Sequence, residues 1–187
     1  LTSGIVNDVA YGVAVQDDYV WVATTAGASR YNTVTKEWQI FTEKNAPMEE
    51  IWNYGVCAGE DKVYLAVWGS GLLEYDGVSG RTILLPLDNT VRSLAVNADG
   101  VVYVGGVGEA GYLQPDEMGQ MQYVSLMEHL RPEERDFGDI WKTYATAEGI
   151  YFTSVDRLLR WQDGRFRSWT RDNGFHFGFV VRDTLYI

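Results

Sequence analysis

The sequence predicts an all-β fold: a β-propeller arc of four-stranded antiparallel blades that forms a fragment of a larger ring. One strand–turn–strand plan recurs, as in VWVATTAGASRYN at 20–32 and VYLAVWGSGLLEYDG at 63–77. The centres of these segments are about 35 to 48 residues apart, near the repeat length of propeller blades. Alternating apolar residues broken by glycines exclude helical solenoids of similar period. The strand centres are Trp21, Tyr64, Tyr103, Tyr151 and Tyr186.

The repeats divide this single partial propeller into about four complete units and the incomplete start of a fifth. Each complete unit holds four strand-like runs, as in DYVWVATT and GASRYNTV of the first unit and KVYLAVW and SGLLEYDG of the second. The turns between the runs carry Gly, Asn or Asp, which favour tight reversals. The third and fourth units follow the same plan, with VVYVGGV and GIYFTSV as their second strands. The approximate limits of the five units are 5–48, 49–88, 89–139, 140–174 and 175–187.

Stacking such units side by side buries their aromatic faces and leaves only short protected edges. The first strand of each unit should crowd the propeller axis, and the small residues of YGVAV and YGVCA fit that position. The only cysteine, Cys57, lies among small and apolar neighbours. We therefore expect a buried structural thiol there rather than a reactive one.

One segment, SLMEHLRPEERDFGD at 125–139, is too long and too charged for a turn within a blade. SLMEHL carries helix formers, and Pro132 suits the first position of a further helical turn. We expect a short helical excursion between the third and fourth units. Such an excursion is either part of a binding site or a solvated linker.

Composition and charge exclude several classes of function. The net charge is −11 and no stripe of Lys and Arg is present, so nucleic-acid binding has almost no support. The acidic surface also argues against binding to anionic lipid, and no stretch reaches membrane-spanning length. The chain starts at Leu1 and ends in a strand-like run, so we interpret it as a piece of a longer protein.

No motif for catalysis, metal binding or a cofactor stands out, so we expect this segment not to be an enzyme. The chain has two histidines, His129 and His176, and no G-x-S-x-G element. GGVGEAG at 105–111 has the glycines of a dinucleotide loop, but the next residues continue as a strand. The acidic residues lack the spacing of a calcium loop, and none of them form an obvious pair for glycoside cleavage.

Aromatic and polar residues at the starts of the first strands are the remaining candidates for a site. In a propeller these starts surround one mouth of the central channel. Trp with Asn, Arg or Lys suits a sugar or another polar organic ligand, because it offers an apolar face with directional donors. The alternative is that the tryptophans pack between blades and the polar residues are structural. The candidate ligand-binding residues are Trp52, Asn53, Arg92, Trp141, Lys142 and His176.

The units resemble the two-component regulator propeller repeat, whose usual core is LWIGTxxGLxRYD. The resemblance rests on VWVATTAGASRYN and VYLAVWGSGLLEYD and extends over essentially the whole chain. The third unit departs from it, with Pro115–Asp116 in place of the Tyr–Asp pair, and the fourth has Trp161–Gln162.

The resemblance implies a ligand-sensing segment on the periplasmic or extracellular side of a membrane-anchored bacterial receptor. In that family paired propellers precede a membrane helix and a histidine kinase or diguanylate cyclase, and an oligosaccharide is the typical ligand in gut examples. It implies a homodimeric parent receptor in which ligand or partner binding biases the dimer geometry. Two alternatives stay open: a propeller enzyme of the lyase or lactonase type, and a plain protein-interaction propeller.

Overall fold

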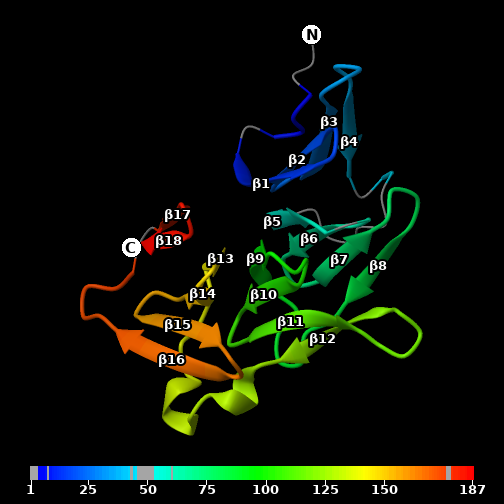
Figure 1. The fold of residues 1–187 in the computed structure, drawn as a ribbon. Helices are drawn as coiled ribbons and strands as arrows, with labels where there is room; N and C mark the ends of the chain where they lie inside the picture. The colour runs from blue at the N-terminus through cyan, green and yellow to red at the C-terminus, as the bar shows by residue number, and fades with distance from the viewer. Residues whose placement is uncertain (1–3, 8, 43, 46–52, 60, 176–177) are drawn as a thin grey trace. The chain divides into compact units, whose positions relative to one another are not determined.

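The computed structural model describes residues 4–7, 9–42, 44–45, 53–59, 61–175 and 178–187. Within these residues the chain forms four antiparallel sheets of four strands and one sheet of two strands (Figure 1). In every four-stranded sheet the strands are neighbours in chain order, as expected for propeller blades. The predicted all-β fold of four-stranded blades is confirmed. The chain divides into two compact units. The first comprises Leu1–Leu84 and Asn89–Val91, and the second comprises Leu85–Asp88 and Arg92–Ile187.

The first unit contains two sheets with short hairpin connections. Sheet 1 consists of β1 (Ala10–Gln16), β2 (Tyr19–Thr24), β3 (Gly27–Asn32) and β4 (Trp38–Phe41). Sheet 2 consists of β5 (Asn53–Ala58), β6 (Val63–Val67), β7 (Gly71–Tyr75) and β8 (Gly80–Ile83). β-Branched and aromatic residues dominate β2 and β6, which are the most buried strands of their sheets.

The core of the first unit lies between these two sheets. Trp21 of β2 is 2% exposed and stacks on Phe41 of β4, with ring centroids 5.1 Å apart. Tyr75 of β7 meets both rings edge-on, and Leu73 is buried in the same cluster. The aromatic strand centre of the repeat is therefore an anchor between neighbouring sheets.

The first strands, β1 and β5, approach one another closely at two glycines. A Cβ atom at Gly12 would lie 3.0 Å from Cα of Gly55, tighter than most real Cβ contacts, so a larger residue would push the two backbones apart. The register of each strand shifts beside its glycine, between Ala10 and Gly12 and between Asn53 and Gly55. Small residues on the first strands therefore reflect backbone crowding, as the sequence predicted. Cys57 of β5 is buried, as predicted, and burial raises the pKa of its thiol to about 12.

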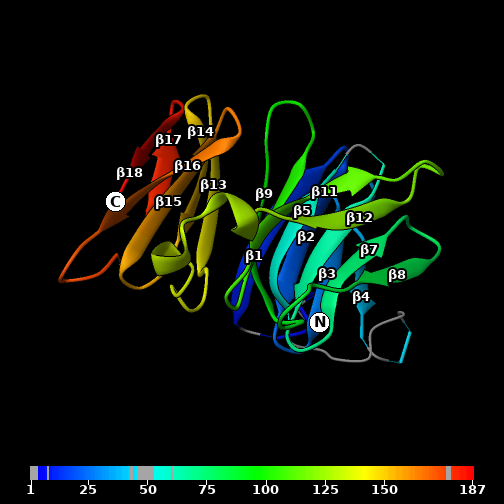
Figure 2. The same cartoon turned by 90° about the horizontal axis from the view of Figure 1, so that it is seen from below.

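The second unit contains two four-stranded sheets and one hairpin. Sheet 3 consists of β9 (Val91–Val96), β10 (Val102–Gly106), β11 (Ala110–Pro115) and β12 (Met121–Ser125). Sheet 4 consists of β13 (Lys142–Thr146), β14 (Gly149–Thr153), β15 (Arg157–Gln162) and β16 (Arg165–Thr170). The hairpin of β17 (Phe179–Val181) and β18 (Thr184–Tyr186) contacts β13 (Figure 2).

The excursion between sheets 3 and 4 forms two short 3₁₀-helices, η1 (Met127–His129) and η2 (Pro132–Glu134). Pro132 starts the second of them, as the sequence predicted. Leu126 and Leu130 flank η1 and are each 2% exposed. They join Phe152 and Leu159 in the core of the second unit. The excursion is therefore packed onto the fold and is not a solvated linker along its whole length.

Turns between the third and fourth strands explain the Tyr–Asp and Tyr–Asn pairs of the repeat. Oδ1 of Asn32 accepts hydrogen bonds from the backbone N–H groups of Val34 and Thr35 at 2.8 and 2.9 Å. Asp76 makes the same contacts in sheet 2, and Asp116 makes similar ones in sheet 3. Hydrogen bonds from Ser79 and Val78 lower the pKa of the Asp76 carboxyl to about 2. Although Pro115 replaces the tyrosine, Asp116 keeps the carboxylate that binds the backbone of the turn.

Candidate functional site

The start of the first strands in the second unit brings three side chains together. Arg92 is the second residue of β9, and its Nε and Nη2 atoms both lie 2.8 Å from Oδ2 of Asp139. Its guanidinium carbon also lies 4.7 Å from the ring centroid of Trp141. The side chains of Arg92 and Asp139 are 13% and 22% exposed, whereas Trp141 is 45% exposed. An aromatic face is thus held open to solvent above a paired, largely buried charge.

Backbone and side-chain bonds between sheets 3 and 4 position this cluster. The N–H of Ile140 donates to the carbonyl of Gly106 at 3.0 Å, which fixes the residues on both sides of it. The Ser93 hydroxyl donates to the carbonyl of Ile140 at 2.9 Å and lies 2.8 Å from the Thr143 hydroxyl. A Cβ atom at Gly105 would lie 2.3 Å from Cγ2 of Ile140, so only glycine allows this approach. The Arg92 cluster therefore stands on a rigid junction.

Lys142 follows Trp141 and is exposed at the first position of β13. It is paired with Thr153 of β14, so its side chain belongs to the same sheet face as Thr153. Two residues further along that face, the hydroxyl of Tyr144 donates to the carbonyl of Gly178 at 2.8 Å. Burial raises the pKa of Tyr144, which keeps this hydroxyl protonated as the donor.

Of the other predicted site residues, Asn53 is among the described residues. Asn53 belongs to the first unit, is 1% exposed and donates its Nδ2 atom to the carbonyl of Thr24 at 3.4 Å. That contact links β5 with the end of β2. Trp52 and His176 lie outside the described residues. The structure thus brings Arg92 and Trp141 into contact, and Lys142 is the next residue in the sequence. The ligand-binding role of all six residues stays a prediction.

Asp139 was not among the predicted site residues, although it completes the cluster. The signal was an acid in DFGDIW, two residues before Trp141. Its partner Arg92 is 47 residues away in the chain, so the pair was not visible as a local motif. Within the described ranges, no group of three or more His, Cys, Asp or Glu side chains is arranged to hold a metal ion. The chemistry that the cluster offers is apolar stacking together with an oriented cation.

A hollow lies beside the excursion, between η1, η2 and the edge strand β16. Its volume is about 500 Å³. His129 tilts against Trp161 at its inner side, with ring centroids 4.9 Å apart. Arg131 and Glu134 face each other across η2, with Nη2 of the arginine 2.9 Å from Oε1 of the carboxylate. Arg131 and Glu134 pair with each other, Arg167 of β16 also lines the hollow, and the hollow is wide and open.

Comparison with known proteins supports the fold independently. No family model and no curated protein matches the chain. The extracellular domain of the hybrid two-component system BT4673 from B. thetaiotaomicron is similar, with a TM-score of 0.68 at 17% identity. That match covers 89% of this chain and 23% of the domain. The extracellular domain of BT3049 from the same organism has a TM-score of 0.67 at 13% identity, over 94% of this chain and 24% of that domain.

Enzymes are also among the similar structures. Virginiamycin B lyase from Staphylococcus aureus, solved with quinupristin, has a TM-score of 0.63 at 13% identity. The match covers 92% of this chain and 58% of the lyase.

None of the described helices is long and apolar enough to cross a membrane. The chain spans about a quarter of the receptor domains that it matches, and it has the propeller fold of the sensor family that its repeats resemble.

Proposed function

We propose that the chain is a ligand-sensing propeller segment in the extracytoplasmic region of a membrane-anchored two-component receptor, and that it carries no catalysis itself. The observation that supports this most is the agreement between the repeat motifs and the receptor domains of the same fold. In this proposal the parent receptor lies on the periplasmic side, acts as a homodimer and passes the signal to a kinase or cyclase.

We place ligand binding at the Arg92 cluster, defined by Arg92, Asp139 and Trp141. Trp141 is 45% exposed although its neighbour Ile140 is fully buried, so the ring is presented to solvent at a rigid position. Asp139 and Trp141 hold the Arg92 guanidinium from two sides, which fixes its orientation beside the ring. A ring face beside an oriented donor suits an oligosaccharide or a similar polar organic ligand.

Binding of neutral oligosaccharides tests the site directly. Trp141→Ala removes an exposed ring, so it should leave the fold intact and weaken binding about tenfold or more. The measurement is isothermal titration of the chain with tetrasaccharides of glucose, xylose and mannose. Trp38→Ala is the matched control, because Trp38 is 41% exposed but belongs to the first unit. Equal affinity of Trp141→Ala and the unaltered chain would count against this site, as would the absence of binding to every sugar.

The gene around the chain tests the receptor assignment separately. We expect further repeats, then one apolar span of about 20 residues and a kinase or cyclase domain. A free-standing propeller without a membrane span would instead favour the second candidate, an enzyme. The similarity to virginiamycin B lyase is the observation that supports that candidate.

A further inference from the structure

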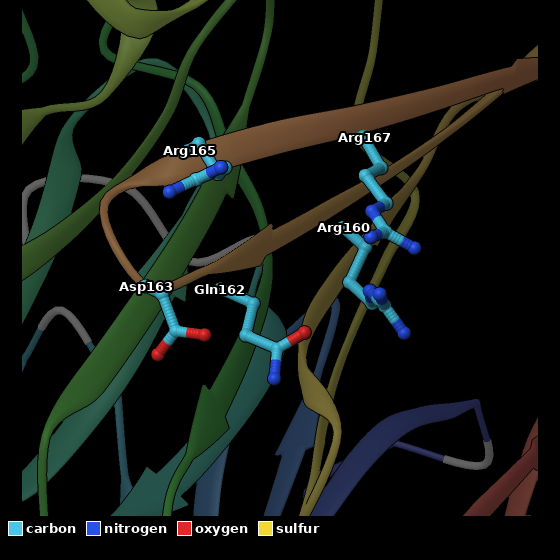
Figure 3. A pocket seen from close by; sticks show the side chains of 5 residues that line it. All are labelled: Arg160, Gln162, Asp163, Arg165 and Arg167. Carbon is cyan, nitrogen blue, oxygen red and sulfur yellow. The ribbon is translucent and has the colours of Figure 1, made fainter.

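The hairpin of β15 and β16 is strongly basic although the chain as a whole is acidic. Residues 157–171 hold five arginines and a single acid, Asp163, whereas the net charge of the chain is −11. Arg160, Arg165 and Arg167 line a hollow of about 230 Å³ together with Gln162 and Asp163. Figure 3 shows the side chains of Arg160 and Arg167 next to each other, with Arg165 and Asp163 nearer the turn.

Arg160 and Arg167 occupy a position that recurs in each four-stranded sheet. In each sheet the aromatic centre of the second strand is paired with one residue of the third strand, which is in turn paired with one residue of the fourth strand. These aromatic centres are Trp21, Tyr64, Tyr103 and Tyr151. These pairs are Arg30 with Gln39, Glu74 with Arg81, Tyr112 with Val124, and Arg160 with Arg167.

At this position sheet 2 pairs opposite charges, sheet 1 pairs an arginine with a neutral amide, and sheet 3 has no charge. Nη2 of Arg30 donates to Oε1 of Gln39 at 2.5 Å in sheet 1. Nη2 of Arg81 lies 3.3 Å from Oε1 of Glu74 in sheet 2. Among the described sheets, only sheet 4 places two like charges opposite each other. Like charges in directly paired positions destabilise a sheet unless a counter-charge lies between them.

The charges in sheet 4 are only partly satisfied. Nη1 of Arg160 lies 3.4 Å from Oε2 of Glu148 and 3.4 Å from the hydroxyl of Tyr151. The Arg160 side chain is 14% exposed, and its Nε atom is buried without a hydrogen-bond partner among the described residues. Arg167 makes no ion pair within the described part of the chain. The Glu148 carboxylate therefore pairs with Arg160 alone, and the buried Nε donor of Arg160 is left over.

Sheet 1 shows that a hollow at this position stays open when the next sheet is packed. Its equivalent, lined by Arg30, Asn32 and Gln39 among others, has a volume of about 330 Å³. Trp21 and Phe41, on the same face of sheet 1, are nevertheless covered by Tyr75 of sheet 2. A small solute can therefore reach the pair from outside the interface between two sheets.

We propose that Arg160 and Arg167 bind a small oxyanion, the carboxylate, phosphate or sulfate group of an acidic solute. An oxyanion between them removes the cross-strand repulsion and accepts charge-assisted hydrogen bonds from both guanidinium groups. Asp163 opposes anions at the turn, so the anion lies at the Arg160–Arg167 end of the hollow. The site is on the outer strands of sheet 4 and does not depend on the proposed function of the Arg92 cluster.

Titration of the chain with inorganic phosphate tests the proposal, with sodium chloride as the control at equal ionic strength. The readout is the Nε–H resonance of Arg160 in ¹H–¹⁵N spectra, assigned by its loss in Arg160→Lys. We expect this resonance to shift saturably with phosphate and not with chloride. Arg167→Gln should weaken the phosphate affinity about tenfold or more, because one of the two charged donors is lost. Arg171→Gln removes the same charge just beyond β16 and should leave the affinity unchanged.

The stability of Arg167→Gln gives a second readout. This variant recreates the Arg–Gln pair of sheet 1, so without phosphate it should raise the unfolding midpoint by about 1 to 3 °C. Phosphate should reverse that order, because it stabilises the unaltered chain, which binds it more tightly, by more than it stabilises Arg167→Gln. The proposal is overturned if phosphate shifts Arg160 equally in Arg167→Gln, or if all arginine resonances shift together without saturation.

Discussion

Glu109, the residue before β11, carries a buried carboxyl group that accepts hydrogen bonds but makes no ion pair with the described residues. It is 2% exposed. The hydroxyls of Tyr123 and Ser125 donate to its Oε2 atom at 2.8 and 2.9 Å. Burial raises the pKa of Glu109, and the two hydrogen bonds partly offset that rise. The folded chain therefore favours the protonated carboxyl more than the unfolded chain does.

The pH dependence of stability should reveal this residue. A raised pKa contributes stability that is fully present below the unfolded value of 4.5 and is lost as pH rises through the folded value. Glu109→Gln does not titrate and keeps an acceptor for both hydroxyls. Its free energy of unfolding should therefore fall less than that of the unaltered chain as the pH rises above 4.5. Urea unfolding measures it, with the exposed Glu117→Gln as control. A slope unchanged by Glu109→Gln would show that the burial of Glu109 does not govern this range.

Residue chemistry could be predicted from the sequence only where it was local. Arg92 and Trp141 could be predicted as candidates because each lies next to the start of a first strand at the repeat spacing. Asp139 was missed, because its pairing with Arg92 depends on how sheets 3 and 4 join. The same reason hid Arg160 and Arg167, which meet only through the register of β15 and β16.

At the scale of elements, the turn after the third strand carries the most regular side-chain interaction of the repeat. Asn32 and Asp76 bind two backbone N–H groups each in sheets 1 and 2. Sheet 4 uses a different device: Asp163 and Gly164 have positive φ angles of 51° and 75°, which fit a two-residue hairpin turn. These turns determine the register of the last strand in each sheet.

Substitution of Asn32 tests the turn without introducing a buried charge. Asn32→Ala removes the acceptor for Val34 and Thr35 and should lower the free energy of unfolding by about 1 kcal/mol. Asn32→Asp restores the acceptor that sheet 2 uses and should be close to the unaltered chain. Chemical denaturation of the three proteins measures both effects. If Asn32→Asp were as unstable as Asn32→Ala, the amide and not the shared oxygen would be responsible.

The strands could be predicted because alternation and turn residues are local signals. The irregularities within the strands and the form of the excursion could not be predicted in this way. The register shifts beside Gly12 and Gly55 arise from the approach of β1 to β5, which no pattern within either strand reveals. The excursion was predicted as helical, but its 3₁₀ form and the burial of Leu126 and Leu130 on both sides of η1 were not predicted.

At the scale of the whole molecule, the apolar interior is divided. Trp21, Leu65 and Leu73 belong to one cluster in the first unit. Phe152, Leu159 and Ile140 belong to another in the second. In repeat architectures each repeat depends mainly on its neighbours, so stability is not uniform along the chain.

A core deletion should therefore act mainly on its own unit. Leu73→Ala truncates a side chain that is 3% exposed and should cost about 2 to 5 kcal/mol. Hydrogen exchange should then show faster exchange in β1 to β8 and nearly unchanged exchange in β10 to β16. Leu159→Ala is the reciprocal variant, with the opposite pattern expected. Uniform acceleration along the whole chain would mean that the two clusters unfold as one cooperative body.

The single buried thiol allows the opening of one strand to be followed by its rate of chemical modification. Cys57 lies on the first strand of sheet 2, and a pKa of about 12 leaves almost none of it as the reactive thiolate near neutral pH. An alkylating reagent can therefore modify the chain only when that strand opens. Because no second cysteine competes, the increase in mass with time counts the openings of one strand in otherwise native molecules.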